Sequence, residues 1–189
     1  IKCGIIGIAS NKPVSMNIVN SLKKLEYGGY DSAGLATLDK DEISEKKCSG
    51  RVEELEKILF KNPSDGNLGI GHVRWATHGI PNIVNAHPHS SEIVSVVHNG
   101  IIENSDELKK KLELKGLKFK SQTDTEVITL LITEALKDNK PLESVFNTLK
   151  QLKGSFALGI IFKNYKNIII GARRGSPLAV GYSKEENYL

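Results

Sequence analysis

Short runs of apolar, often β-branched residues recur along the chain and are separated by stretches with helical periodicity. Runs of this kind, bounded by Gly, Asn or Lys, are typical of strands. The sequence predicts strands at Gly4–Gly7, Gly34–Leu38, Leu68–Val73, Ile93–Val97, Phe156–Phe162 and Ile168–Gly171. Because several of these runs are apolar nearly throughout, we expect strands that are covered on both faces.

Helical spacing follows the first strand, where Val14, Ile18 and Leu22 recur after a turn-like segment that ends at Pro13. Further helices are predicted at Ser105–Leu114, Asp124–Lys137 and Pro141–Leu152. The second of these follows Thr123–Glu126, whose Thr and Glu have the spacing of a capping box. The sequence contains no internal repeat or linker, so the pattern predicts one α+β domain in which helices pack over sheets.

Composition narrows the class of protein. With 189 residues, of which 39% are hydrophobic and 25% charged, the chain has the length and balance of one folded domain, which argues against disorder. The net charge of +4 is mild and the lysines are scattered, which indicates a solvated surface and no nucleic-acid partner. No apolar stretch approaches the ~20 residues that cross a bilayer, so no membrane partner is expected. The two cysteines, Cys3 and Cys48, do not make a disulfide framework, which predicts a cytoplasmic location.

Cys3 is the first candidate for chemistry because it lies almost at the start of the chain. At a true N-terminus, a cysteine combines a thiol nucleophile with an α-amine that can serve as its base. The amine titrates near pH ~8 and the thiol near ~8.5, so proton transfer between them is nearly balanced. Ile1 and Lys2 precede Cys3, and while they remain its nitrogen is an amide, which cannot act as a base. This chemistry therefore requires their removal.

A second candidate segment, Gly71–Gly79, follows a predicted strand and contains Arg74, Trp75, Thr77 and His78. Arginine offers planar, two-point recognition of a carboxylate, and loops concentrate binding groups. The alternative interpretation makes Trp75 a core anchor, His78 a surface residue and Arg74 an ordinary ion-pair partner. This segment alone does not separate the two interpretations.

Two further positions could complete such a site. His98–Gly100 ends an apolar strand, and the amide of Asn99 beside the N–H of Gly100 would make an oxyanion hole, in which one donor is worth ~3 kcal/mol. Asn-Gly is also a common hairpin turn, so a turn is the alternative. Asp124 lies in the first turn of a predicted helix, where exposed amides favour a carboxylate. It could instead accept the ammonium of an amino acid whose carboxylate binds Arg74.

Metal and cofactor sites are not predicted. His87–His89 contains two histidines, but a metal site needs three or four converging ligands, and no Cys or carboxylate cluster has matching spacing. Gly69–Gly71 lacks the third glycine and the acidic residue of a dinucleotide-binding loop. Cys48 lies in a polar, lysine-rich stretch and has no predicted role.

Six sequence blocks carry a family resemblance that covers essentially the whole chain. The blocks are Cys3–Gly7, Leu25–Gly34, Gly71–Gly79, Asn85–His89, Val97–Asn104 and Thr123–Glu126. In this order they resemble the N-terminal glutaminase domain of glucosamine-6-phosphate synthases, which are glutamine amidotransferases of the N-terminal-nucleophile class. Six blocks in sequence are far more specific than any one of them.

The resemblance implies a four-layer αββα sandwich of the N-terminal-nucleophile hydrolase type. It implies that the chain hydrolyses the side-chain amide of glutamine, its small-molecule substrate, to glutamate and ammonia through a cysteine thioester. Cys3 would be the nucleophile, and Asn99 with Gly100 would form the oxyanion hole. The residues implied to hold or cover glutamine are Arg74, Trp75, Thr77, His78 and Asp124.

The chain departs from the family pattern at three points. Gly28 stands where the family has arginine, and Ile1 and Lys2 precede the cysteine that the family places first. The chain also stops at Leu189, so residues 1–189 are predicted to be a C-terminally incomplete glutaminase domain without sugar-phosphate isomerase domains. A separate sugar-phosphate isomerase chain would then be a partner. The alternative function is a catalytically impaired relic or glutamine-binding module of the same fold.

Overall fold

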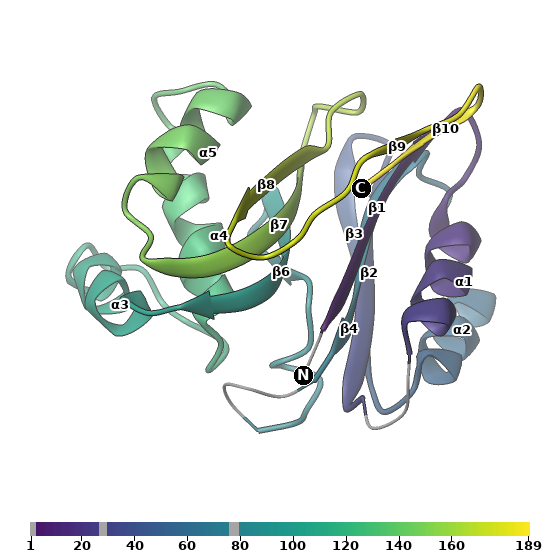
Figure 1. Cartoon of the computed structure of the whole chain (residues 1–189), viewed down its shortest axis with the longest axis horizontal. Helices are drawn as coiled ribbons and strands as arrows, with labels where there is room; N and C mark the ends of the chain where they lie inside the picture. Colours follow the sequence, from purple (N-terminus) through teal and green to yellow (C-terminus); the bar gives the residue numbers. More distant parts are fainter. Residues whose placement is uncertain (1–2, 27–29, 76–79) are drawn as a thin grey trace.

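The computed structural model describes residues 3–26, 30–75 and 80–189, which form two β-sheets packed face to face between two helical layers (Figure 1). The first sheet is built from β1 (Gly4–Ser10), β2 (Ser32–Asp39), β3 (Glu42–Ser49), β4 (Leu68–Arg74), β9 (Gly181–Tyr182) and β10 (Glu186–Tyr188). Its strands lie in the order β3-β2-β4-β1-β10-β9. Its outer face is covered by α1 (Ser15–Leu25) and α2 (Val52–Lys61).

The second sheet is built from β5 (His89–Ser90), β6 (Val94–Ile102), β7 (Gly154–Phe162) and β8 (Ile170–Arg174), in that order. The other helical layer contains α3 (Ser105–Leu114), α4 (Asp124–Ala135) and α5 (Pro141–Leu149), with α4 lying on β6. The predicted α+β class and the αββα order of layers are therefore confirmed. Strands β2, β4, β6 and β7 are buried over most of their length, as their continuous apolar runs indicate.

One helix and one long strand are missing from the sequence prediction. Helix α2 carries Val52, Leu55 and Leu59 at helical spacing, and all three are buried against the first sheet. Strand β3 is polar and half-exposed, so it lacks an apolar signal, and its pairing with β2 holds it in the sheet. The hairpin between them turns at Lys40 and Asp41, which both have positive φ.

The predicted capping box at the start of α4 is wrong. The carboxylate of Glu126 accepts hydrogen bonds from the backbone N–H groups of Lys120 (2.8 Å) and Ser121 (2.7 Å). The hydroxyl of Thr123 contacts Nε2 of His89 at 2.8 Å, and no side chain caps the helix. The buried backbone N–H of Ser121 needs an acceptor, so the loop takes the carboxylate that the sequence pattern assigns to the helix.

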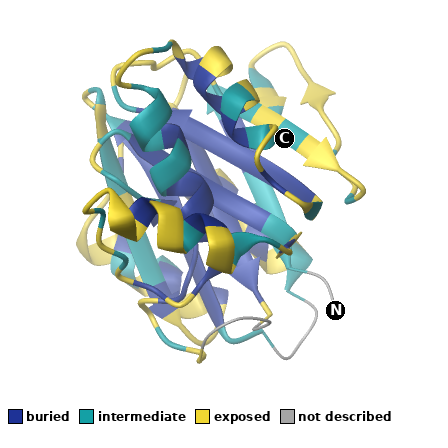
Figure 2. Cartoon of the chain, turned by 90° about the vertical axis from the view of Figure 1, so that its left-hand side faces the viewer, coloured by how far each residue is buried: buried dark blue, intermediate teal, exposed yellow. Residues whose placement is uncertain are grey.

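The core has three apolar clusters that follow the layers. One lies between the second sheet and its helices, and another lies between the first sheet and α1 with α2. The third cluster lies between the two sheets and consists of Ala36, Leu38, Leu68, Ile70, Val97 and Ile161. Figure 2, viewed from the side of α4 and α5, shows buried strands behind helices whose outer faces are partly exposed.

Two further observations concern the cysteines and the length of the helices. Cys3 and Cys48 are both free thiols, and Cys48 is buried on β3 in the cluster beneath α1 and α2. Within the described ranges, no helix combines the length and the apolar character that crossing a membrane requires.

Candidate active site

A cavity of about 420 Å³ opens where β1 begins, β4 ends and β6 passes the N-terminus of α4. Its wall includes six residues that the sequence singles out for chemistry, which are Cys3, Arg74, Trp75, Asn99, Gly100 and Asp124. They come from both sheets and from α4, so only the packing of the layers brings them together. The cavity is also lined by His87 and His98, and by Ser155 on β7.

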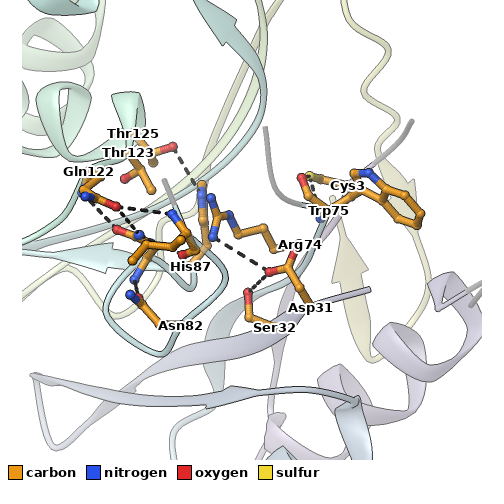
Figure 3. Close-up of polar contacts among 12 residues, drawn as sticks. Cys3, Asp31, Ser32, Arg74, Trp75, Asn82, His87, Gln122, Thr123 and Thr125 are labelled. Atoms are coloured by element: carbon orange, nitrogen blue, oxygen red, sulfur yellow. Dashed lines mark hydrogen bonds and ion pairs between the residues drawn. The ribbon is translucent and has the colours of Figure 1, made fainter. Parts of the chain in front are cut away.

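Cys3 lies directly before β1 and is partly buried. Its Sγ accepts a hydrogen bond from the backbone N–H of Trp75 at 3.2 Å, as the close-up shows (Figure 3). Burial raises the pKa of the Cys3 thiol, and the Trp75 hydrogen bond and the charge of Arg74 offset only part of that rise. The thiol is therefore protonated at neutral pH, and it needs a base before it can act as a nucleophile.

Asn99 and Gly100 lie within β6, which corrects two expectations. The predicted strand end at Val97 and the alternative hairpin turn are both wrong, because β6 continues to Ile102 and pairs with β7 throughout. The strand context directs Nδ2 of Asn99 to the carbonyl oxygen of Cys3, 2.9 Å away. This contact places the amide of Asn99 beside Cys3.

Gly100 occupies a position that only glycine fits. Its φ is +134°, and a Cβ there would lie 2.2 Å from the backbone oxygen of Ser155 on the paired strand. Backbone of this conformation is rarely adopted by residues with a side chain. At Gly100 the cavity wall is therefore formed by backbone atoms that no side chain covers.

Arg74 is both a cavity residue and an ion-pair partner. It is 3% exposed, and its Nη1 lies 3.8 Å from Oδ1 of Asp31. The hydroxyl of Ser32 donates to the same carboxylate oxygen at 3.0 Å, and Figure 3 shows the guanidinium reaching towards this pair. A backbone hydrogen bond also joins these two residues, because the N–H of Asp31 donates to the carbonyl of Arg74 at 3.1 Å.

Trp75 follows Arg74 at the edge of the cavity. It is 36% exposed, so the alternative interpretation of Trp75 as a core anchor is wrong. Its indole meets the ring of Tyr30 edge to face, with ring centroids 6.1 Å apart. The indole therefore packs along the rim, beside Cys3.

Asp124 is held in the first turn of α4, where the sequence places it. It is 8% exposed, and its Oδ2 accepts a hydrogen bond from the backbone N–H of Ile102 at 2.8 Å. Its Oδ1 lies 3.7 Å from Nδ1 of His98, which also contacts the hydroxyl of Thr125 at 3.0 Å. These contacts orient a carboxylate at the cavity wall opposite in charge to Arg74.

Buried histidines form a cluster beside the cavity that the sequence does not predict. The rings of His72 and His87 stack with centroids 4.0 Å apart, and His87 meets His89 edge to face at 4.8 Å. Burial lowers the pKa of His72 to about 3 and the pKa values of His87 and His89 well below the usual value, so all three are neutral. Among the described residues, no group of three or more His, Cys, Asp or Glu is arranged to hold a metal.

Five residues singled out by the sequence lie outside the part of the chain that the structure describes. Thr77 and His78, named as glutamine contacts, lie there, and so do Gly28, Ile1 and Lys2. Cavity residues to which the sequence assigns no role include His87, His98, Ser155 and Ser176. They carry no local signal, because each comes from a different element and only the tertiary structure brings them to the cavity.

The fold and the residues of the cavity are those expected for a glutamine amidotransferase domain, and comparison with known proteins agrees with this class. Residues 82–189, which include Asn99, Gly100 and Asp124, match the family described as the glutamine amidotransferase domain. The match covers more than half of the chain, and the chain belongs to this family.

Two relatives of the chain have the same protein name. The chain is 51% identical over 188 residues to glutamine–fructose-6-phosphate aminotransferase (isomerizing) of Bradyrhizobium diazoefficiens, and 48% identical over 188 residues to that of Zymomonas mobilis. In both cases the alignment covers 99% of this chain and 31% of the relative. The resemblance to the glutaminase domain of glucosamine-6-phosphate synthases is thereby confirmed, and the chain spans about a third of the length of these relatives.

Solved structures support the fold. Glutamine phosphoribosylpyrophosphate amidotransferase from B. subtilis superposes with a TM-score of 0.84 at 26% identity, covering 97% of this chain and 40% of that protein. A glutamine aminotransferase class-II domain protein from Silicibacter pomeroyi gives a TM-score of 0.67 at 14% identity, covering 97% and 86%. The sandwich is therefore that of the glutamine amidotransferases of the N-terminal-nucleophile type.

Proposed function

We propose that this chain is a glutaminase domain that hydrolyses the side-chain amide of glutamine to glutamate and ammonia. The observation that carries the proposal is the meeting, in one cavity, of a thiol, an amide donor and two buried groups of opposite charge. They belong to Cys3, Asn99, Arg74 and Asp124. Glutamine offers the complementary set, which is a carboxamide, a carboxylate and an ammonium.

Arg74 and Asp124 hold the two charged groups of glutamine in this proposal. The guanidinium binds the α-carboxylate, and the carboxylate of Asp124 binds the α-ammonium. Both side chains are less than a tenth exposed, and charge-assisted hydrogen bonds are stronger where water is excluded. Trp75 borders the bound substrate, and Thr77 with His78 completes the contacts by analogy with the family.

Acyl transfer then proceeds on Cys3. Its Sγ proton passes to a base as Sγ bonds to the carboxamide carbon of glutamine, which gives a tetrahedral intermediate with a negative oxygen. One N–H of the Asn99 side-chain amide and the backbone N–H of Gly100 stabilise that oxygen, as in an oxyanion hole. The C–N bond breaks, the nitrogen takes the proton from the base and leaves as ammonia, and water hydrolyses the γ-glutamyl thioester to glutamate and free thiol.

The base in this scheme is the α-amine of Cys3. Since burial raises the pKa of the thiol, spontaneous ionisation is suppressed and a nearby proton acceptor is required. An α-amine on the same residue meets that need without a second side chain. The scheme therefore requires a Cys3 that is no longer preceded by Ile1 and Lys2. A thiol nucleophile also requires reducing conditions, and we place the reaction in the cytoplasm.

Ammonia release points to a second half-reaction in the longer relatives. By analogy with the aminotransferases named above, the ammonia would convert fructose 6-phosphate to glucosamine 6-phosphate. Residues 1–189 would be the glutaminase domain, and sugar-phosphate isomerase domains on a longer or separate chain would bind the sugar. The relatives are about three times as long as the aligned region, which leaves room for such domains.

The experiment compares two forms of the chain. One is produced with Cys3 as its first residue after removal of an initiator methionine, and the other retains Ile1 and Lys2. Glutamate release from glutamine is measured for both, and intact mass confirms each N-terminus. General acid–base catalysis contributes roughly 100-fold or more, so the form that begins at Cys3 should be faster by at least that factor.

Variants separate chemistry from binding. Cys3→Ala should abolish glutamate release while glutamine still raises the melting temperature, whereas Arg74→Ala should lose that shift first. A form beginning at Cys3 that binds glutamine but releases no glutamate would favour a glutamine-binding relic. Absence of both binding and release would reject the proposal.

A further inference from the structure

A buried hydrogen bond links the two sheets beside the candidate site. Nε2 of His72 on β4 lies 2.9 Å from the backbone carbonyl oxygen of His98 on β6. Both residues are at most 3% exposed. A carbonyl can only accept, so Nε2 carries the hydrogen and donates it.

The two ends of this bond are attached to the two halves of the proposed catalytic machinery. His72 stands opposite Ile5 in the β1–β4 ladder, two residues from Cys3. The carbonyl of His98 belongs to the peptide group whose N–H is that of Asn99. The bond therefore joins the strand that carries the thiol to the strand that carries the oxyanion-hole amide.

On the other side of this bond from Asn99, the contacts between the sheets are apolar. Ile70, two residues before His72, and Val97, one residue before His98, belong to the apolar cluster between the sheets. Apolar packing is non-directional, and it tolerates a slide of one sheet over the other better than a hydrogen bond does. The His72 bond has a defined direction, and it is made to one particular carbonyl of β6.

The imidazole of His72 is itself held in place. Its ring stacks on His87 with an interplanar angle of 11°. The main chain of His87 lies against β2 at Gly34, where a Cβ would come within 2.0 Å of the His87 oxygen. Gly34 pairs with His72 in the β2–β4 ladder, so the close approach that a glycine permits brings the second ring over the first.

We propose that His72 is a positioning residue, which ties β4 to β6 so that the amide of Asn99 faces the thiol of Cys3. The inference rests on the proposed glutaminase function. His72 touches neither Cys3 nor Asn99 in any described hydrogen bond, so it acts through the backbone of His98 and the β1–β4 ladder. Errors of about 1 Å in such alignments lower rates by roughly 100-fold.

The experiment compares substitutions at His72 in the form of the chain that begins at Cys3. His72→Gln places an amide N–H near the position of Nε2 and should keep kcat within about threefold of the unsubstituted chain. His72→Leu and His72→Asn lack a donor at that position, and both should lower kcat by roughly 10- to 100-fold. Ile70→Val, two residues earlier on the same face, is the matched control and should leave kcat unchanged.

Two readouts distinguish positioning from a general loss of structure. The melting-temperature shift that glutamine produces, and the rate at which iodoacetamide alkylates Cys3, should both be retained in His72→Asn while kcat falls. If His72→Leu does not fold, His72→Asn carries the test. Equal kcat in His72→Asn and the unsubstituted chain, or a kcat for His72→Gln as low as for His72→Asn, would overturn the inference.

A separate measurement keeps the inference distinct from the proposed function. If the unsubstituted chain releases no glutamate, the function fails, and the role of His72 is read from nuclear magnetic resonance. The ring of His72 should then show a proton on Nε2 and none on Nδ1. His72→Asn should shift the backbone and side-chain amide signals of Asn99, and His72→Gln should restore them; unshifted signals would contradict the role.

Discussion

The layer between the two sheets has two ends of opposite character, although the same strands build both. On β4 the inward positions are Leu68 and Ile70 at one end and His72 and Arg74 at the other. On β6, Val97 at the apolar end is followed two residues later by Asn99. All of these positions on β4 are buried, so burial alone does not separate core from site.

The difference lies in how each end is stabilised. The apolar end depends on close packing, where the loss of a side chain leaves a cavity. The polar end depends on specific partners, such as Asp31 for Arg74 and the His98 carbonyl for His72. Substitutions at the apolar end should therefore change stability, and substitutions at the polar end should change activity.

The largest effect on stability is expected from Ile70→Ala at the apolar end. Ile70 is fully buried between the sheets, and removing its side chain should lower the free energy of unfolding by about 2–5 kcal/mol. Denaturant unfolding measures this loss. Activity per folded molecule should remain close to that of the unsubstituted chain. A loss below about 0.5 kcal/mol would mean that the inter-sheet packing is loose.

Asn99→Ala should reverse this pattern at the polar end. Loss of an oxyanion-hole donor lowers kcat by roughly 100- to 1,000-fold, equivalent to about 3–4 kcal/mol in the transition state. The stability change should be smaller, because the main loss in the folded state is the hydrogen bond to Cys3. Glutamate release and denaturant unfolding on the same sample compare the two effects. A variant with normal kcat would remove Asn99 from the mechanism.

Acid should destabilise the protein through the polar end. Burial lowers the pKa of His72 to about 3 and those of His87 and His89 well below their usual value, whereas a histidine in the unfolded chain titrates near ~6.5. Below pH ~6.5 the unfolded chain therefore binds protons that the folded protein does not, and stability falls as pH falls. The contribution of His72 stops changing near its folded pKa of about 3.

The expected slope is about 1 kcal/mol per pH unit for each such histidine once pH is below ~6.5. Denaturant unfolding between pH 6.5 and 5 measures it, and His72→Gln, which removes one of the three groups, should be less steep. A slope that is the same in both proteins would show that His72 titrates normally in the folded state.

The smallest effect is expected from Ser95→Ala, a polar exception at the apolar end. Ser95 is fully buried on β6, and its hydroxyl lies 2.7 Å from that of Ser90. Removing one hydrogen bond should cost about 0.5–1.5 kcal/mol, with no change in activity. A loss of unfolding free energy as large as that of Ile70→Ala would show that this hydrogen bond stabilises the apolar end as much as apolar packing does.

The local pattern of apolar and polar residues predicted most of the helices and strands. It failed where a contact between residues distant in the sequence was stronger than the local preference. Helix α3 is found at its predicted bounds, and the apolar runs of β4 and β7 are strands. The Asn-Gly pair in β6 favours a turn locally, but pairing with β7 carries the strand past it. Glu126 has the spacing of a capping residue, but backbone amides in the preceding loop take its carboxylate.

The sequence by itself determined which residue types could do chemistry here. A thiol near the start of the chain, an Asn-Gly pair, an arginine and a helix-start aspartate are local features, and the order of the blocks around them points to the family. Their roles at Cys3, Asn99, Gly100, Arg74 and Asp124 remain predictions. All five line one cavity.

Only the tertiary structure decided how these residues face one another. The ion pair of Arg74 with Asp31, the contact of Asn99 with Cys3 and the bond between His72 and His98 join residues that are distant in the sequence. The first depends on the pairing of β2 with β4 within one sheet, and the other two depend on how the two sheets pack against each other. Hydrophobic periodicity indicates which face of a strand is buried, but it contains no information about which buried group lies opposite, because apolar burial is non-directional.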